Sequence, residues 1–177
     1  MPIQQALDAG ADIVTVPQIR DVEHARMAAS YAQHPPLGTR GVGHRRINRN
    51  TGFAADFCER ENERTRFIAM IETEEAFDDM ARIAALSGVD GLFIGPGDLS
   101  MTRGRGLNKD TPEDAADHKR IIDTAIAAGK PWSMAAGHPK RRKMAIERGA
   151  AFITISDDVS AMYGGLAQSL AAARDDK

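Results

Sequence analysis

The chain has 177 residues, a formal net charge of −2, 42% hydrophobic residues and 27% charged residues. A chain of this size can form one globular domain, 1–177, and bury about 70% of its unfolded surface. No apolar run approaches the ~18 residues of a membrane span, and the near-neutral charge argues against a dedicated nucleic-acid binder. Residues 1–12 show no signal-peptide pattern, and Cys58 is the only cysteine. We therefore expect a cytoplasmic protein without an internal disulfide or a multi-cysteine metal site.

One sequence unit occurs three times and predicts three buried strands. Each copy has a glycine that can end a helix in the left-handed conformation, followed by a short apolar run rich in β-branched residues. The copies span Asp8–Pro17, Ser87–Pro96 and Glu147–Ser156. Three further strands are predicted at Thr39–Gly43, Arg66–Thr73 and Pro131–Ala136, which gives six strands in all.

The segments between these strands carry helical patterns. Asp21 is a candidate N-cap, as is Thr111, which is followed by Pro112 and by a helix expected to end near Gly129. Strands that alternate with helices predict a parallel sheet. Two segments read as loops, Arg45–Glu63 with one short helix and Leu99–Asp110 throughout. The remaining helices are predicted at Val22–Gln33, Glu74–Leu86, Pro139–Arg148 and Val159–Arg174.

Two carboxylates stand at predicted strand ends, where parallel α/β folds form their sites. Glu72 closes one strand, and Asp98 follows the next one 26 residues later, about one strand–helix step. Neighbouring strands lie ~4.8 Å apart, so both carboxylates can reach one ion. Two carboxylates with no histidine or cysteine nearby in sequence suit a hard cation such as Mg²⁺ or Mn²⁺.

A purely structural interpretation of the same residues stays open. Glu72 can cap the helix that follows it, and Asp98 can cap the turn before Leu99. The tripeptide Gly95-Pro96-Gly97 can bring the backbone close to an anionic ligand, or it can be an ordinary tight turn. Spacing alone does not choose between these interpretations.

Several motifs nevertheless make the chain similar to a known enzyme family. The sequence MIET at Met70–Thr73, followed by GVDGLFIGPGDLS at Gly88–Ser100, resembles the metal-dependent class II pyruvate aldolases. These are 4-hydroxy-2-oxo-acid aldolases of the citrate-lyase-like superfamily, the HpcH/HpaI aldolases. Agreement in order and spacing extends to LDAGADIVTVPQI (Leu7–Ile19), HPPLGTRGVG (His34–Gly43) and GAAFITISDD (Gly149–Asp158).

The resemblance implies a TIM (β/α)₈-type barrel and reversible cleavage of a 4-hydroxy-2-oxo acid to pyruvate and an aldehyde. By motif, Glu72 and Asp98 match the metal-binding carboxylates. The divalent metal, Mg²⁺ or Mn²⁺ with Co²⁺ as a further candidate, would chelate pyruvate and stabilise its enolate as a Lewis acid. The backbone of Gly95, Pro96 and Gly97 matches the segment that lies against pyruvate.

The resemblance also implies roles for two residues far from the metal motif. Asp8 matches an acidic position that, in the family, reaches a neighbouring subunit's active site. Arg40 matches a recurrent arginine, here expected to support catalysis or to form a structural salt bridge. The family's last helix is usually exchanged between subunits in trimer-based assemblies, so we expect a homo-oligomer.

The chain departs from the family pattern in two places and in its length. Met70 stands where many members carry glutamine, and His44 stands where others have a small residue. A closed eight-stranded barrel takes ~250 residues, so the chain is about 75 residues short of it. In the family the preceding segment supplies two strands, a histidine and an aspartate implicated in proton transfer, and an arginine that orients the substrate. The six predicted strands therefore match family strands three to eight.

Two of the histidines are candidates to replace the missing base. His44 and His138 follow strand ends and can face the site, although a surface or supporting position explains them equally. His24 and His118 lie in predicted helices and are expected to face solvent. No pair has the helical spacing of a zinc site.

Basic segments and isolated residues admit two interpretations each. The cluster His138–Lys143 can contact nucleic acid or be a solvated helix end. Arg103 and Arg105 can bind an acidic aldehyde tail or a coenzyme A phosphate, or lie in a mobile surface loop. Trp132 is expected in the core, and Cys58 is expected to be a buried or an incidental thiol rather than a nucleophile.

We thus predict a divalent-metal aldolase domain with an incomplete barrel of about six parallel strands. The alternatives are a citryl- or malyl-CoA-type lyase, and a catalytically silent fragment or assembly subunit that keeps the metal site. An incomplete barrel exposes two strand edges. We expect the edges at Ile13–Pro17 and Phe152–Ser156 to be open, covered by local structure, or paired with another chain.

Overall fold

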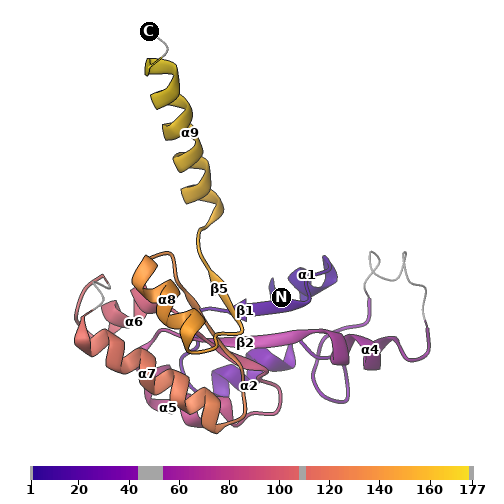
Figure 1. The fold of residues 1–177 in the computed structure, drawn as a ribbon. Coiled ribbons are helices and arrows are strands. Elements are labelled where there is room, and N and C mark those ends of the chain that lie inside the picture. The colour runs from indigo at the N-terminus through magenta and orange to yellow at the C-terminus, as the bar shows by residue number, and fades with distance from the viewer. Residues whose placement is uncertain (1, 44–53, 108–110, 176–177) are drawn as a thin grey trace.

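The computed structural model describes residues 2–43, 54–107 and 111–175, which form one parallel sheet with helices packed along it (Figure 1). Each strand pairs with the next one along the chain, so the sheet order is the chain order. The first and last strands are the two edges, and the barrel is therefore incomplete. The strands are β1 (Ile13–Val16), β2 (Arg66–Ile71), β3 (Gly91–Ile94), β4 (Trp132–Ala135) and β5 (Phe152–Thr154).

Helices alternate with the strands, as in a (β/α) barrel. Within the described residues they are α1 (Pro2–Asp8), α2 (Val22–Ser30), α4 (Phe57–Arg64), α5 (Glu74–Ala84), α6 (Pro96–Thr102), α7 (Pro112–Ala127), α8 (Pro139–Glu147) and α9 (Asp158–Asp175). The helix caps predicted from sequence are confirmed. Asp21 accepts a hydrogen bond from the backbone of His24, and Thr111 forms a capping box with Asp114. No helix in the described part of the chain combines the length and apolar character needed to cross a bilayer.

The predicted strand at Thr39–Gly43 is wrong, and five strands are described instead of six. The backbone N–H groups of Thr39 and Arg40 donate to carbonyls of Ser30 and Gln33, at 2.7 and 2.8 Å. The acceptors are a carbonyl at the end of α2 and a carbonyl in the turn after it. Because these N–H groups are already hydrogen-bonded there, they do not pair with a neighbouring strand. The segment is held against a helix end rather than added to the sheet.

The left-handed glycines were predicted correctly in two of the three repeated units. Gly10 and Gly149 adopt φ values of 107° and 75° at the ends of helices that precede strands. Gly88, in the second unit, does not have a positive φ. Leu86 and Val89 instead share a tight turn there, in which the Val89 N–H donates to the Leu86 carbonyl.

The core lies between the sheet and the helices that pack on it, with α5 against β2, α7 against β3 and β4, and α2 against α5. Phe67 and Ile71 of β2 and Leu92 of β3 are fully buried in this layer. Trp132 belongs to the same cluster, which confirms its predicted place in the core. The packed layer fixes the strand ends, and therefore fixes the loops that carry the site.

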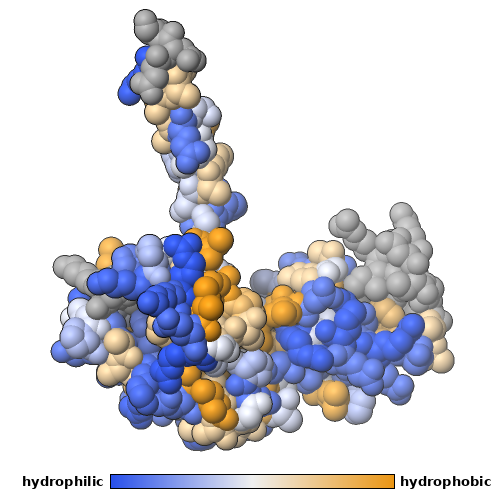
Figure 2. Space-filling view, viewed as in Figure 1, coloured by the Kyte–Doolittle hydropathy of each residue, from blue (hydrophilic) through white to orange (hydrophobic). Residues whose placement is uncertain are grey.

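The C-terminal helix α9 stands away from the sheet and exposes an apolar stripe (Figure 1). The exposed apolar residues are Val159, Met162, Tyr163, Leu166 and Leu170. The surface at the foot of α9 is also apolar (Figure 2), and Ile155, after β5, is exposed there as well. A contiguous exposed apolar surface of this kind marks an interaction site.

Candidate functional site

A cavity of about 490 Å³ opens at the carboxyl ends of β2, β3, β4 and β5. Glu72 directly follows β2, and Gly95, Pro96, Gly97 and Asp98 follow β3 and begin α6. The structure therefore brings the predicted metal ligands and the predicted pyruvate-binding segment to one cavity. The parallel pairing of β2 with β3, which aligns Ile71 with Ile94, places both strand ends at the same level.

Glu72 is 3% exposed and is held by a residue from the first strand unit, Gln18. The Gln18 backbone N–H donates to Oε1 of Glu72 at 2.7 Å, and the Gln18 side-chain amide donates to the same oxygen at 3.0 Å. Gln18 adopts a φ of 55°, a conformation that non-glycine residues rarely adopt and that concentrates at functional sites. Oε1 is thus occupied by hydrogen bonds from the protein.

Burial raises the pKa of the Glu72 carboxyl above its ordinary value, and the nearby charge of Asp98 raises it further. The hydrogen bonds from Gln18 oppose this shift. Two carboxylates that face each other at a cavity repel one another when both are ionised. A cation placed between them removes that repulsion.

The oxygen donors at this edge fit a hard divalent cation. Glu72 and Asp98 supply two carboxylates, and the cavity leaves space for water or substrate oxygens to complete the coordination of Mg²⁺ or Mn²⁺. Among the described residues no group of three or more histidine, cysteine, aspartate or glutamate side chains is placed to hold a metal. The donor set that the described residues offer at this cavity is therefore the two carboxylates of Glu72 and Asp98.

Asp8 and Arg40 lie together, away from this cavity. The Arg40 guanidinium donates to Oδ1 of Asp8, at 3.0 Å from Nη2 and 3.3 Å from Nε, and Glu61 lies 3.6 Å from Nη2. The Arg40 side chain is completely buried, and Asp8 ends α1 before β1 begins. The salt bridge that the sequence left open for Arg40 is present, while the catalytic roles of Asp8 and Arg40 stay predictions.

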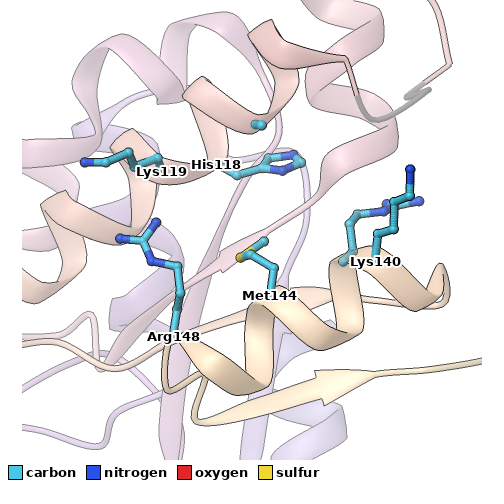
Figure 3. A pocket seen from close by; sticks show the side chains of 7 residues that line it. His118, Lys119, Lys140, Met144 and Arg148 are labelled. Atoms are coloured by element: carbon cyan, nitrogen blue, oxygen red, sulfur yellow. The ribbon is translucent and has the colours of Figure 1, made fainter.

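One of the described histidines, His118, differs from its predicted position. His118 is 4% exposed, so the prediction that it faces solvent is wrong; its side chain faces the space between α7 and α8 (Figure 3). His24 is half-buried, and His138 is the N-cap residue of α8. His44 lies outside the described residues. The proton-transfer role considered for His44 or His138 stays a prediction.

The segment predicted as a loop over Leu99–Asp110 is helical through Thr102, as the end of α6. Beyond it, Arg105 lies 2.9 Å from Asp114 and Arg103 lies 2.8 Å from Asp117, both carboxylates of α7. These ion pairs hold α6, which carries Asp98, against α7. The stretch that carries Arg103 and Arg105 is thus tied to α7, and the ligand-binding role considered for the two arginines stays a prediction.

Replacement of Asp114 by asparagine tests this connection between α6 and α7. Burial opposes ionisation of Asp114, but hydrogen bonds from Arg105 and then Thr111 outweigh it and lower the carboxyl pKa. We expect Asp114→Asn to lower the free energy of unfolding at pH 7 by about 2 kcal/mol, because Arg105 loses a buried partner.

The pH dependence of that loss follows from the lowered pKa. A group whose pKa is lower in the folded state stabilises the protein above its unfolded pKa, about 3.9, and loses this contribution as the pH falls further. Urea unfolding of the unchanged chain and of Asp114→Asn should therefore differ at pH 7 and converge below pH 4. An equal difference at both pH values would contradict the assignment.

Two residues of the site escaped the sequence analysis. Gln18 follows β1 as Glu72 follows β2, so the rule about strand ends points to it once β1 is placed. Arg141 belongs to the basic segment after β4 and lines the cavity, as its one cation among the described residues. Its position in the first turn of α8, the helix that follows the end of β4, was the available signal. The basic composition of His138–Lys143 instead suggested a nucleic-acid contact or a solvated helix end.

The sequence and the fold of the chain both match a known enzyme family. The chain belongs to the HpcH/HpaI aldolase/citrate lyase family, whose model matches residues 1–163. A 4-hydroxy-2-oxo-heptane-1,7-dioate aldolase from Klebsiella pneumoniae is 35% identical over 96% of this chain, which spans 64% of that relative's length.

Solved structures agree with the assignment. An HpcH/HpaI aldolase/citrate lyase family protein from Burkholderia cenocepacia superimposes with a TM-score of 0.84 at 30% identity, covering 97% of this chain and 68% of its own. The citrate synthase SbnG superimposes with a TM-score of 0.83 at 25% identity, covering 98% and 67%.

Proposed function

We propose that the chain is the metal-binding part of a divalent-metal aldolase that cleaves a 4-hydroxy-2-oxo acid to pyruvate and an aldehyde. The observation that carries the proposal is the placement of Glu72 and Asp98 at one cavity, beside the Gly95–Gly97 backbone. The similarity to an aldolase of this class over 96% of the chain supports it. The relative is named as an aldolase for 4-hydroxy-2-oxo-heptane-1,7-dioate. For this chain we propose only the class of substrate, a 4-hydroxy-2-oxo acid, and do not specify the aldehyde product.

Glu72 and Asp98 would hold the cation, Mg²⁺, Mn²⁺ or Co²⁺. When bound, the cation supplies Lewis-acid chemistry that favours the negative charge developing on the 2-oxo acid during carbon–carbon cleavage. Gln18 fixes one oxygen of Glu72, which leaves Oε2 to face the cavity. The backbone of Gly95–Gly97 forms the wall against which a flat, three-carbon acid can lie.

Arg141 supplies positive charge for the substrate carboxylate in this proposal. Its guanidinium is a planar fork of donors that matches a carboxylate. The side chain is half-buried and lines the same cavity as Glu72 and Asp98. It can therefore bind the carboxylate of a 2-oxo acid that occupies the cavity beside Glu72 and Asp98.

Substitution of Arg141 gives a specific kinetic prediction. Arg141→Gln should raise KM for pyruvate about tenfold, because a charge-assisted hydrogen bond contributes ~1.5–3 kcal/mol, with a smaller effect on kcat. The matched control is Arg142→Gln, one residue further along α8 and outside the lining of the cavity. Equal KM values for the two variants would remove Arg141 from the site.

The cleavage reaction itself is tested by pyruvate release. We expect Mn²⁺-dependent release from a 4-hydroxy-2-oxo acid in the absence of coenzyme A, and its loss when the metal is chelated. Turnover that requires a coenzyme A thioester would instead favour a citryl- or malyl-CoA-type lyase. Metal binding without turnover would favour a silent or assembly subunit, and complementation by a chain supplying two more strand–helix units would refine that result.

We also propose that copies of the chain assemble, with a trimer as the basic unit that the family implies. The open edges of β1 and β5 and the apolar stripe of α9 provide surfaces for such contacts. Light scattering on the purified chain tests the assembly. The cytoplasmic location expected from the lone Cys58 stays a prediction.

A further inference from the structure

The turn after β1 sets Gln18 against one oxygen of the Glu72 carboxylate. The Gln18 backbone N–H and side-chain amide both donate to Oε1, at 2.7 and 3.0 Å. The other oxygen, Oε2, lies toward Gly95, because a Cβ added to Gly95 would have Oε2 as its nearest neighbour. Gly95 lines the Glu72–Asp98 cavity, whereas Gln18 is not among the described residues that line it. The two oxygens of Glu72 therefore face different surroundings.

An uncommon backbone conformation directs both donors of Gln18 to the same atom. Its φ of 55° lies in the left-handed region, which non-glycine residues rarely adopt. The next residue, Ile19, is fully buried, and its carbonyl accepts from the hydroxyl of Thr73 at 2.8 Å, directly beside Glu72. A conformation of this kind persists where the surrounding structure over-determines it, and it concentrates at functional sites. The turn is thus fixed against the end of β2, with its donors on Glu72.

Two donors on one carboxylate oxygen leave that oxygen no free site for a metal ion. An ionised carboxylate accepts at about four lone-pair sites, two on each oxygen. The backbone and side-chain donors of Gln18 use both sites of Oε1. Glu72 is then left with Oε2 as the oxygen that it can offer to a cation.

We propose that Gln18 is a positioning residue that makes the Glu72–Asp98 site selective for Mg²⁺ or Mn²⁺ over Ca²⁺. Carboxylate oxygens by themselves suit all three ions. Mg²⁺ demands a compact octahedron and keeps several waters, whereas Ca²⁺ takes about six to eight oxygens, often both from one carboxylate. With Oε1 closed by Gln18, Glu72 contributes a single oxygen, which suits the smaller ions. The inference rests on the proposed metal site and adds the residue that sets the choice of cation.

Two substitutions remove the side-chain donor of Gln18 and leave its backbone N–H in place. Gln18→Met keeps the length of the side chain, and Gln18→Gly suits the left-handed backbone, so the two variants share the loss of the amide but differ in size and backbone freedom. Gln18 is exposed, so neither substitution opens a cavity in the core. The matched control is Gln5→Met in α1, which is also exposed and is not among the described residues that line the cavity.

Electron paramagnetic resonance on the full chain measures both affinities without any measurement of turnover. The free Mn²⁺ signal gives the Kd for Mn²⁺, and its rise on addition of Ca²⁺ gives the Kd for Ca²⁺. Circular dichroism of each variant checks that the compared proteins are folded.

We expect both Gln18 variants to raise the Kd for Mn²⁺ about tenfold, because loss of a partner that supports a metal ligand costs about 10–100-fold in affinity. The Kd for Ca²⁺ should stay within about twofold or fall, since the freed site on Oε1 lets Ca²⁺ bind both oxygens. The ratio of the Kd for Ca²⁺ to the Kd for Mn²⁺ should therefore fall at least about fivefold. Gln5→Met should keep the ratio of the unchanged chain.

The possible results separate the role of Gln18 from the proposed metal site. An unchanged ratio in the Gln18 variants of a chain that binds Mn²⁺ would overturn the role of Gln18 and leave the metal site standing. A fall in only one of the two variants would also overturn that role, since both lack the same donor. Failure of the unchanged chain to bind Mn²⁺ would overturn the proposed metal site, and the role of Gln18 with it.

Discussion

Replacement of Glu72 by glutamine should weaken Mn²⁺ binding by more than about a hundredfold. Loss of a partner that only supports a metal ligand already costs 10–100-fold in affinity, and Glu72 is one of two carboxylates proposed to contact the ion directly. The glutamine keeps the size of the side chain, and its amide oxygen can still accept from Gln18. The fold should therefore survive while the negative charge disappears. Titration of the free Mn²⁺ signal by electron paramagnetic resonance measures the change.

The matched control for this experiment is Glu75→Gln. Glu75 lies three residues further on, in the first turn of α5, and is exposed to solvent. The Glu75→Gln substitution removes one negative charge close to Glu72 but does not change a residue that lines the cavity. The affinity for Mn²⁺ should therefore be unchanged. If both variants bound Mn²⁺ as the unchanged chain does, Glu72 would be a structural residue held by Gln18 and not a metal ligand.

A single methyl group at Gly95 should disrupt the same site, because Gly95 lies directly against Glu72. An added Cβ would lie 2.4 Å from Oε2 and 2.8 Å from Cβ of Glu72, and 3.2 Å from the sulfur of Met70. The carboxylate tip can rotate away, but the Cβ contact requires the strand ends to separate. We expect Gly95→Ala to lower the free energy of unfolding by about 1–3 kcal/mol and to weaken Mn²⁺ binding at least tenfold.

Gly97→Ala provides the comparison, since an added Cβ at Gly97 meets nothing within 4 Å. Gly97 lies in the first turn of α6, where alanine is the better helix former. This variant should be as stable as the unchanged chain or slightly more so, with Mn²⁺ affinity retained. Chemical denaturation and Mn²⁺ titration of Gly95→Ala and Gly97→Ala measure these effects on stability and metal affinity. Similar behaviour of both alanine variants would mean that Gly95 is not fitted to Glu72.

Local signals predicted most of the fold. Asp21 and Thr111 mark helix starts because a side-chain oxygen can accept from an orphan backbone N–H, and both do so. The strand β3 was identifiable because a buried parallel strand is apolar on both faces, and all four of its residues are buried. These features depend on a few neighbouring residues, which a sequence displays directly.

Features that depend on long-range contacts were missed. The segment at Thr39–Gly43 was predicted as a strand, but the N–H groups of Thr39 and Arg40 donate to carbonyls at and after the end of α2. His118 looked exposed because its helix is polar, whereas the structure buries it beside the cavity between α7 and α8. Gln18 reaches Glu72 across 54 positions of sequence, a distance that no local pattern covers. The carboxylate pair was predictable because one strand–helix step separates its members.

Hydrogen exchange at the methyl group of pyruvate tests the central claim most directly, since it requires metal and the 2-oxo acid but no aldehyde partner. The unchanged chain would be incubated with pyruvate in D₂O, with Mg²⁺ or Mn²⁺ or with a chelator, and deuterium in pyruvate followed by mass spectrometry. We predict metal-dependent incorporation that Glu72→Gln reduces to the rate seen without protein. Equal incorporation with and without the chain, or full exchange by Glu72→Gln, would contradict the claim that Glu72 and Asp98 form the aldolase metal site.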